Sequence, residues 1–170
     1  MTETIARYRL QGASWTLAIT NEAAAFFQRY VQRRWLNKES VGQLYTRDLT
    51  SREVIVERAT LLTRVSAAWT WVSFDVKQAV AERAAMFEQG YHCLGLWHTH
   101  PEPIPQPSRK DLRLLKNHAA AAATQDYAGM VFAILGTRPL PLGLGIWVHD
   151  GEVLHEAAGE TLGSPDQLKT

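Results

Sequence analysis

The sequence predicts an α/β (α+β) fold in which helices flank a mixed β-sheet. Apolar runs of strand length alternate along the chain with amphipathic stretches of helical length. Capping residues, glycines and prolines mark the boundaries between these segments. The chain has 170 residues, 46% of them hydrophobic, which suffices for one globular core. We therefore expect a single domain over residues 1–158, followed by a polar C-terminal tail over residues 159–170.

The elements of the first half have recognisable start and stop signals. Thr20 or Asn21 can cap the first helix, and Asp75 can cap the second, which Gly90 closes. The second helix carries an apolar stripe that we expect to face the core, formed by Val76, Val80, Ala84 and Phe87. The predicted elements are a strand over 15–19, a helix over 21–35, strands over 39–46 and 53–57, and a helix over 75–89.

The second half begins with the apolar and aromatic run 91–98, which indicates a largely buried strand. Four of the seven prolines lie in residues 101–107, and because proline restricts φ we expect this loop to be stiff. Ser108 can cap a helix that extends to Thr124. The remaining predicted strands are 127–135, 142–149 and 153–156, the last two joined by a turn at 150–151.

The most informative motif is His98-Thr99-His100, followed by Ser108 and Asp111. Residues two apart on a strand point to the same side, so His98 and His100 can face one ion. Asp111 lies in the first turn of the next helix, where its carboxylate can turn back toward the end of the strand. Two imidazoles and a carboxylate can fill three positions of a tetrahedral zinc site and leave the fourth open, as in a catalytic site.

A purely structural interpretation of the same residues is also available. Ser108 and Asp111 have a spacing close to that of a capping box, and capping alone would explain both. The conjunction of four residues at fixed spacing on a strand, a loop and a helix favours the metal site. The remaining histidines lack ligand spacing, and we assign none of them to the metal: His92, His118, His149 and His155.

These residues resemble the motif of the JAMM (MPN-plus) zinc metalloproteases, in their prokaryotic single-domain form. The resemblance covers residues 15–155 and includes the strand end Gly-x-Trp-His-Thr-His-Pro. The family's upstream signature, a Glu followed by Gly, any residue and Leu, is matched by Glu39, Gly42 and Leu44. A family glycine two residues after the leucine is replaced here by Thr46. The resemblance implies a JAMM/MPN (cytidine-deaminase-like) fold.

The resemblance also implies a role for each motif residue. His98, His100 and Asp111 would be the ligands of one Zn²⁺ per chain. Glu39 would be the general base, and Ser108 would donate a hydrogen bond to the transition state. The implied activity is that of a zinc-dependent peptidase or isopeptidase that cleaves after the C-terminus of a ubiquitin-like protein, in deconjugation or maturation.

The implied partners follow from the same resemblance. The compact form is similar to prokaryotic members, some of which resemble partners of bacterial ubiquitin-like conjugation systems, including antiphage defence operons. We therefore expect a ubiquitin-like protein or its conjugates as the substrate, with ubiquitin-activating-like and conjugating-like enzymes in the same operon. An extended C-terminal tail would bind by adding a strand beside an exposed sheet edge.

Three other functions stay open at this level. They are a noncatalytic MPN scaffold, a RadC-like DNA-associated protein, and a peptidase that releases sulfur or cysteine from a small carrier protein. The presence of all five motif residues argues against the scaffold. The short stretch before the first predicted strand and the net charge of +1 argue against the RadC-like protein.

Composition supports a cytoplasmic protein without nucleic-acid or membrane partners. No apolar stretch approaches about 18 residues, and the N-terminus lacks a signal-peptide profile. The single cysteine, Cys93, cannot form an intramolecular disulfide, which suits a reducing compartment, and its place inside a buried strand argues against a nucleophile. Trp69 and Trp71, two residues apart, are expected to pack in the core or an interface.

Overall fold

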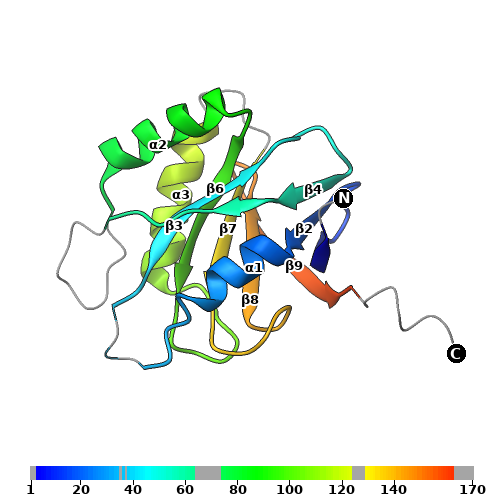
Figure 1. The fold of residues 1–170 in the computed structure, drawn as a ribbon, viewed down its shortest axis with the longest axis vertical. Coiled ribbons are helices and arrows are strands. Elements are labelled where there is room, and N and C mark those ends of the chain that lie inside the picture. The colour runs from blue at the N-terminus through cyan, green and yellow to red at the C-terminus, as the bar shows by residue number, and fades with distance from the viewer. Residues whose placement is uncertain (1–2, 35, 37, 64–73, 124–128, 163–170) are drawn as a thin grey trace, which may run out of the picture.

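The computed structural model describes residues 3–34, 36, 38–63, 74–123 and 129–162, which form a sheet and three helices (Figure 1). The helices are α1 (Asn21–Gln28), α2 (Val76–Glu88) and α3 (Arg109–Ala123). The strands are β1 (Thr4–Leu10), β2 (Thr16–Thr20), β3 (Val41–Thr46), β4 (Glu53–Val56), β5 (Arg58–Ala59), β6 (His92–Thr99), β7 (Met130–Leu135), β8 (Leu144–His149) and β9 (Leu154–Thr161).

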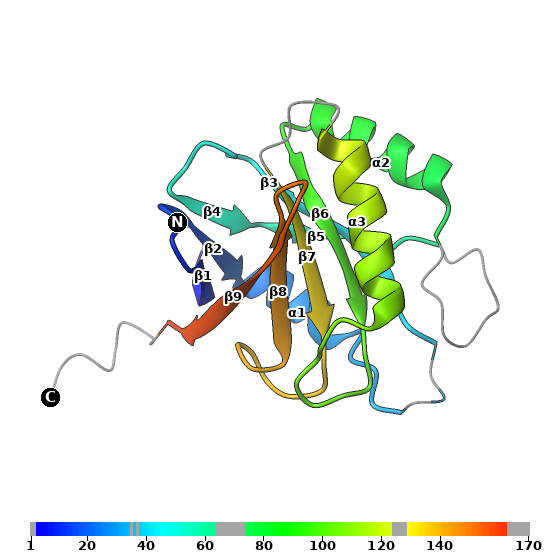
Figure 2. The ribbon, with the colours of Figure 1, turned by 180° about the vertical axis from the view of Figure 1, so that it is seen from behind.

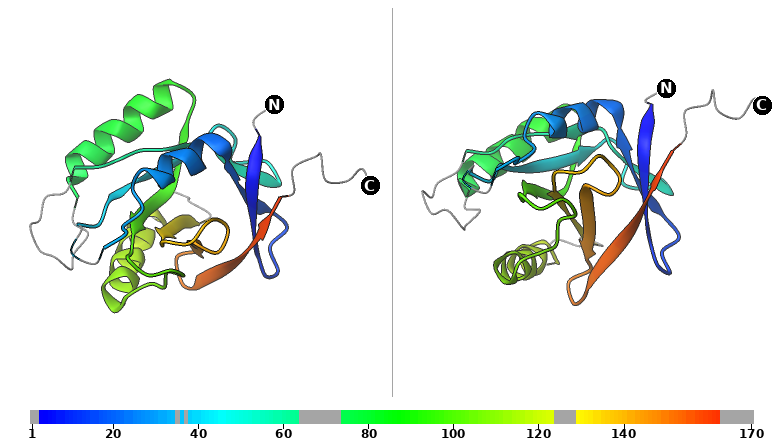
Figure 3. Two further views of the ribbon diagram at one scale, coloured as in Figure 1. Left: turned by 60° about the horizontal axis from the view of Figure 1, so that its bottom comes forward. Right: turned by 90° about the horizontal axis from the view of Figure 1, so that it is seen from below.

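The strands form one mixed sheet in the order β4-β2-β1-β9-β8-β7-β6-β3-β5. The pairs β2–β4 and β6–β7 are parallel, and the other neighbouring pairs are antiparallel. The front and back views place α1 and α3 on opposite faces of the sheet (Figures 1 and 2). The view from below shows the strands lying between these two helices (Figure 3). The predicted α+β fold class is therefore confirmed.

The core lies on both sides of β6. Trp97 is fully buried and meets the rings of Phe26 and Phe27 of α1 on one face. Leu96 belongs to a second apolar cluster on the other face, which includes Leu115 of α3. Because successive side chains of a strand alternate between faces, His98 points to the same side as Leu96, toward α3. The strand thus presents its imidazoles to the helix that carries Asp111.

Two strands and one helix end were not predicted correctly. The sequence interpretation missed β5 and also β1, although buried Ala6, Tyr8 and Leu10 alternate there with Arg7 and Arg9. Thr20 caps α1 as expected, its hydroxyl accepting from the Ala23 N–H at 3.0 Å. The helix nevertheless ends at Gln28 rather than at 35, because the chain turns to bring Gln32 under the end of β6.

The predicted core stripe of α2 was wrong. Asp75 does cap this helix, and Gly90 follows its end with a φ of 79°. The residues that face the core, however, are Ala79 and Met86. The predicted stripe is exposed to solvent, with Val76, Val80 and Phe87 each more than half exposed and Ala84 also exposed.

Four smaller expectations concern the C-terminal tail, two tryptophans, the single cysteine and membrane-spanning helices. Strand β9 continues through Thr161, so residues 159–161 belong to the sheet rather than to the expected tail. Trp69 and Trp71 lie outside the described residues. Burial raises the pKa of the Cys93 thiol to about 11, which keeps it protonated and unsuited to nucleophilic attack. None of the described helices is both long and apolar enough to cross a membrane.

Candidate metal centre

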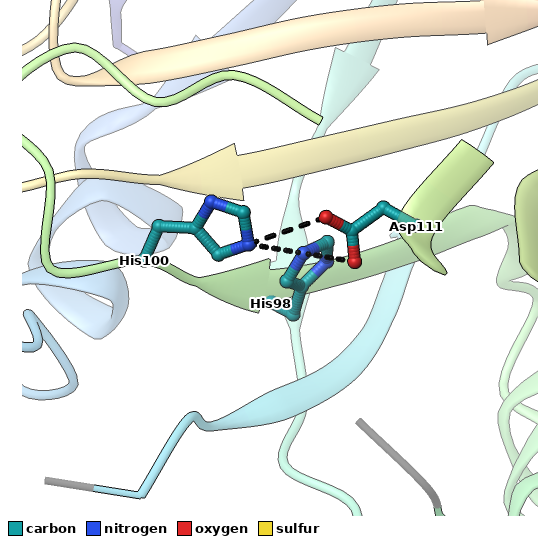
Figure 4. Close-up of side chains that lie close together, drawn as sticks. All are labelled: His98, His100 and Asp111. Atoms are coloured by element: carbon teal, nitrogen blue, oxygen red, sulfur yellow. Dashed lines mark hydrogen bonds and ion pairs between the residues drawn. The ribbon is translucent and has the colours of Figure 1, made fainter. Parts of the chain in front are cut away.

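The end of β6 brings two imidazoles together. His98 and His100 are both buried, and their Nε2 atoms lie 3.2 Å apart (Figure 4). Strand β6 is held on both sides, by β3 through the pairing of Val41 with His98 and by β7 through the pairing of His98 with Ile134. His98 is therefore fixed within the sheet, and His100 follows the strand directly, its N–H donating to the Leu135 carbonyl at 2.8 Å. The expectation that they face one point is met by the geometry.

The first turn of α3 supplies the carboxylate. Asp111 Oδ1 lies 3.2 Å from His98 Nε2, and Asp111 Oδ2 lies 3.3 Å from His100 Nε2 (Figure 4). The ligand atoms of these three residues all lie within 4.8 Å of one another. Among the described residues they form the only group of three or more His, Cys, Asp or Glu side chains that could hold a metal ion.

The structural interpretation of Ser108 and Asp111 is correct as well. The Ser108 hydroxyl accepts a hydrogen bond from the Asp111 N–H at 3.2 Å, and Asp111 Oδ2 accepts one from the Ser108 N–H at 2.6 Å. This reciprocal pair is a capping box with Asp in place of Glu. The cap fixes the carboxylate toward β6 and orients the Ser108 hydroxyl, whose proton stays available for donation. The geometry that caps the helix therefore also leaves Asp111 placed where it could ligate a metal.

The contacts within the cluster lower the pKa of Asp111 and raise that of His100. Burial alone would raise the pKa of Asp111, but hydrogen bonds with His100, His98 and Ser108 outweigh it and hold that pKa well below its usual range. Burial lowers the pKa of His100, whereas Asp111 and the charges of Glu39 and Glu102 raise it, with a net increase. The carboxylate is therefore ionised at neutral pH, as a metal ligand must be.

The donor set fits a metal ion of the zinc type. Two imidazole nitrogens and one carboxylate oxygen match the ligands of catalytic zinc sites. The Nδ1 atom of His100 is buried and has no hydrogen-bond partner among the described residues. Its nearest carboxylate oxygen is Glu102 Oε2, 3.7 Å away. A proton on Nδ1, directed at Glu102, leaves the Nε2 lone pair of His100 available for a metal, which is the usual outer arrangement of a ligating histidine.

Glu39 precedes β3 and lies close to His100. The Ser40 N–H donates to the Thr99 hydroxyl at 2.9 Å, and the Thr99 N–H donates to the Ser40 carbonyl at 3.1 Å. These bonds extend the β3–β6 pairing by one residue and bring Glu39 beside His100. The charge of Glu39 accordingly acts on the pKa of His100. The sequence placed Glu39 inside a strand, whereas β3 begins two residues later, at Val41.

A buried polar pair supports the site from the opposite face of β6. The Thr99 hydroxyl donates to Gln32 Oε1 at 3.3 Å, and both side chains are buried. Thr99 alternates with the two histidines, so it faces away from them. It ties the segment that precedes Glu39 to the strand that carries the imidazoles. The sequence interpretation missed Gln32, although a polar residue between two ligands on a buried strand signals such a contact.

The proline loop is fastened to the loop that follows β7. The Thr137 N–H donates to the Glu102 carbonyl at 2.9 Å, and the Arg138 N–H donates to the Pro103 carbonyl at 3.2 Å. A Cβ atom on Gly136 would lie 2.6 Å from the Glu102 carbonyl oxygen and 2.8 Å from that of Pro103. Glycine is therefore required for this approach, which sets the backbone of Glu102 beside the cluster.

The signature glycine before Leu44 has a comparable cause. A Cβ atom on Gly42 would lie 1.7 Å from the Thr60 carbonyl oxygen and 2.5 Å from the indole nitrogen of Trp97. The Trp97 Nε1–H donates to that same carbonyl at 2.8 Å. Gly42 thus lets the residues that follow β5 run close along β3, which itself pairs with the strand of the histidines.

The sequence also matches a known family. Residues 27–142 match the family described as prokaryotic homologs of the JAB domain. The chain belongs to this family. The prokaryotic JAB match includes Glu39, His98, His100, Ser108 and Asp111, so the whole candidate site lies inside it.

A solved structure shares the fold. The solution structure of protein DSY2949 from Desulfitobacterium hafniense, a structural genomics target, matches with a TM-score of 0.60 and 21% identity. The match covers 81% of this chain and 87% of the other. At this identity the likeness shows the fold alone. No curated protein matches this prokaryotic JAB chain in sequence.

Proposed function

We propose that this prokaryotic JAB protein is a zinc-dependent peptidase or isopeptidase that cleaves after the C-terminus of a ubiquitin-like protein. The observation that carries the proposal is the convergence of three ligand-type side chains with Ser108 and Glu39. His98, His100 and Asp111 gather around one point, and the capping hydroxyl and the Glu39 backbone lie beside it. A site that needed only to fold would not require both imidazole Nε2 atoms to face each other at 3.2 Å.

The chain's own residues divide the reaction between them. Zinc bound by His98, His100 and Asp111 would supply Lewis acidity and a water of lowered pKa. Glu39 would accept the proton of the attacking water and return it to the departing amine, which leaves poorly without it. Ser108, held at the start of α3, would donate its hydroxyl proton to the oxyanion as negative charge develops there.

The surroundings support a narrow approach for the scissile bond. Residues 101–107, held in place by hydrogen bonds to residues 137 and 138, would form one wall of this approach. The chain entering β3 from Glu39 would form the other. Such a passage admits a slender glycine-containing tail and excludes branched residues near the scissile bond. Beyond it, β5 forms the edge of the sheet as described, where an extended tail could add a strand.

The expected setting is a bacterial ubiquitin-like conjugation or antiphage defence operon. In that setting the substrate would be a ubiquitin-like protein joined to a lysine amine or to a short C-terminal extension. Binding energy from the folded partner would orient the tail, so short peptides should be poor substrates.

The test uses the zinc-loaded protein and ubiquitin-like fusions that end in a short extension, with products read by intact mass. We expect cleavage directly after the tail, inhibition by a chelator, and restoration by zinc. A fusion with bulky residues at the end of the tail is the matched control and should resist cleavage. No cleavage of any fusion by protein shown to contain zinc would contradict the proposal, and equal cleavage of fusion, bulky fusion and free peptide would indicate a general peptidase.

A further inference from the structure

Charge is distributed very unevenly in this chain. Segments 29–40, 98–113 and 136–143 hold eight of the 18 Lys and Arg residues but only three of the 17 Asp and Glu residues. These segments therefore carry a net charge of +5, and the rest of the chain carries −4. The overall charge of +1 conceals this separation. The eight cations, called the basic rim below, are Arg29, Arg33, Arg34, Lys38, Arg109, Lys110, Arg113 and Arg138.

The three segments meet around the candidate metal centre. Gln32 is bonded to Thr99 between the two histidines, and Arg138 donates its N–H to Pro103. Arg109 and Lys110 stand between Ser108 and Asp111 in the sequence. The views from the front and the back both place these loops at one end of the molecule, opposite the β6 start (Figures 1 and 2).

The basic rim faces outward, and at least three of its arginines have no acidic partner among the described residues. All eight cations are exposed, whereas the three acids of the same segments are Asp111, which is buried, Glu39 beside His100, and Glu102 near its Nδ1. Elsewhere in the molecule arginines form ion pairs, as Arg7 does with Glu53. Within the described residues, no carboxylate lies within ion-pair distance of Arg33, Arg113 or Arg138.

Part of the basic rim works against folding. Arg109 and Lys110 occupy the first turn of α3, where the helix dipole favours negative charge. Cations at this position cost a little stability, which the cap by Ser108 and Asp111 offsets. The position of these two cations is therefore better explained by a ligand or partner that binds at this end of the molecule than by the stability of α3.

Apolar side chains lie among the cations. Leu36, Ile104, Leu112 and Leu142 belong to the same three segments and are between 44% and 56% exposed. Aliphatic groups set among arginines are typical of a protein interface, where an apolar centre is surrounded by a charged margin. A surface that binds phosphates needs the cations but gains nothing from exposed leucines.

We propose that the basic rim docks an acidic protein surface, namely the folded face of the substrate from which the cleaved tail emerges. This inference rests on the proposed function and specifies its partner: a ubiquitin-like protein with Asp and Glu around the base of its tail. The basic rim attracts that face and the metal centre receives the tail. Recognition by charge mainly speeds encounter and selects partners, and it weakens as salt screens it.

The experiment compares two variants with equal charge change. Arg33→Glu with Arg138→Glu alters the basic rim, and Arg52→Glu with Lys77→Glu alters exposed cations elsewhere. The substrates are a ubiquitin-like fusion with an acidic folded face, the same fusion with those acids replaced by Gln and Asn, and the free tail peptide. We expect the basic-rim variant to raise KM for the acidic fusion about tenfold with kcat unchanged. The other two substrates and the control variant should change less than about twofold.

A binding measurement separates this inference from the proposed activity. Zinc-loaded Glu39→Gln protein is titrated with the acidic fold and with its neutral counterpart at about 50 and 300 mM salt. Tighter binding of the acidic fold, lost at high salt and in the basic-rim background, supports docking even if no fusion is cleaved. Equal binding of both folds overturns the inference. Tight binding of a single-stranded DNA oligonucleotide that depends on the basic rim, without preference for the acidic fold, would also overturn it in favour of a nucleic-acid partner.

Discussion

Two polar clusters lie along β6 and differ in how their hydrogen bonds are used. The metal centre gathers His98, His100 and Asp111 at the end of β6. The second, called the inner polar cluster, consists of Gln43 and Tyr45 of β3, Thr60, and Glu82 of α2, with Cys93 of β6 at its margin. Both join strands to a helix, and both are largely withdrawn from water.

In the inner polar cluster every named donor has an acceptor. Glu82 Oε1 accepts from Gln43 Nε2 at 3.0 Å, from the Tyr45 hydroxyl at 2.9 Å, and from the Thr60 hydroxyl. Burial, together with Cys93 and Glu82, raises the pKa of Tyr45, so its hydroxyl remains a donor. One oxygen of this carboxylate therefore accepts hydrogen bonds from three neighbouring side chains.

In the metal centre two ring nitrogens and a carboxylate converge on one point. Two Nε2 atoms stand 3.2 Å apart with a carboxylate beside both, and His100 Nδ1 has no hydrogen-bond partner among the described residues. Such a cluster is incomplete by itself, because one buried nitrogen is unpartnered and two imidazoles crowd a single carboxylate. Buried polar groups that satisfy one another indicate structure, whereas ligand-type atoms that converge and leave a buried nitrogen unpartnered indicate a ligand.

Removing a ligand should give the largest effect. His98→Ala, His100→Ala or Asp111→Ala should abolish or strongly weaken zinc binding and reduce cleavage to the limit of detection. The fold should persist, because the core on both faces of β6 does not use these side chains. Elemental analysis and far-UV circular dichroism, before and after chelation, measure the two parts. Protein that cannot be loaded with zinc even in its wild-type form would exclude the site.

Removing the base should separate chemistry from metal binding. Glu39→Gln should retain zinc and fold but lose about 100-fold or more in kcat, as expected for a lost general base. The amide keeps the shape of the side chain but cannot accept the proton. Near wild-type turnover in this variant would mean that the base lies elsewhere in the site.

Removing the Ser108 hydroxyl should affect both rate and stability. Ser108→Ala should lower kcat about 100-fold through the oxyanion and destabilise α3 by about 1 kcal/mol through the lost cap. Ser108→Thr is the control, because it retains a hydroxyl that can cap and donate. Urea unfolding and steady-state kinetics separate the two losses, and a stability change with full activity would leave Ser108 as a cap only.

The site was easier to predict from the sequence than the packing. His98, His100, Ser108 and Asp111 lie within 14 consecutive positions, so strand and helix geometry alone bring them together. Glu39 was assigned to the site only through the family signature, since no local sequence pattern links it to His100. Thr99 signalled a polar contact on the opposite face, but the sequence did not identify its partner, because Gln32 lies 67 positions away.

The error in α2 has a physical reason. Helical spacing shows which residues share a face, but not which face meets the sheet. Val76, Val80 and Phe87 form the more apolar stripe, yet the buried face contains Glu82. That carboxylate is acceptable there only because Gln43 and Tyr45 of a distant strand donate to it. The inner polar cluster therefore decided the orientation of the helix, and its partners were not visible in the local sequence.

Changes at Glu102, which faces the Nδ1 atom of His100, should have a smaller effect on zinc affinity. Glu102→Ala should weaken zinc binding about tenfold, because His100 loses the carboxylate that faces its Nδ1 at 3.7 Å. Glu102→Gln retains an acceptor oxygen and should lose less. Competition with a chromophoric chelator measures affinity, and long-range ¹H–¹⁵N spectra report the His100 tautomer. Unchanged affinity and tautomer in both variants would show that Glu102 does not orient the imidazole.

Changes in the inner polar cluster should have the smallest effect on zinc affinity. They test directly whether the two clusters are independent of each other. Glu82→Ala removes the common acceptor and leaves the donors of Gln43, Tyr45 and Thr60 without it, which should destabilise the fold by about 1–3 kcal/mol. Tyr45→Phe is the matched control, since it removes one donor and leaves the carboxylate satisfied by the others. Zinc affinity and kcat should be unchanged in both, because the cluster makes no contact with His98, His100 or Asp111. A tenfold loss of zinc affinity in Glu82→Ala, with the fold intact, would show that the two clusters act as one network and that the distinction between them is wrong.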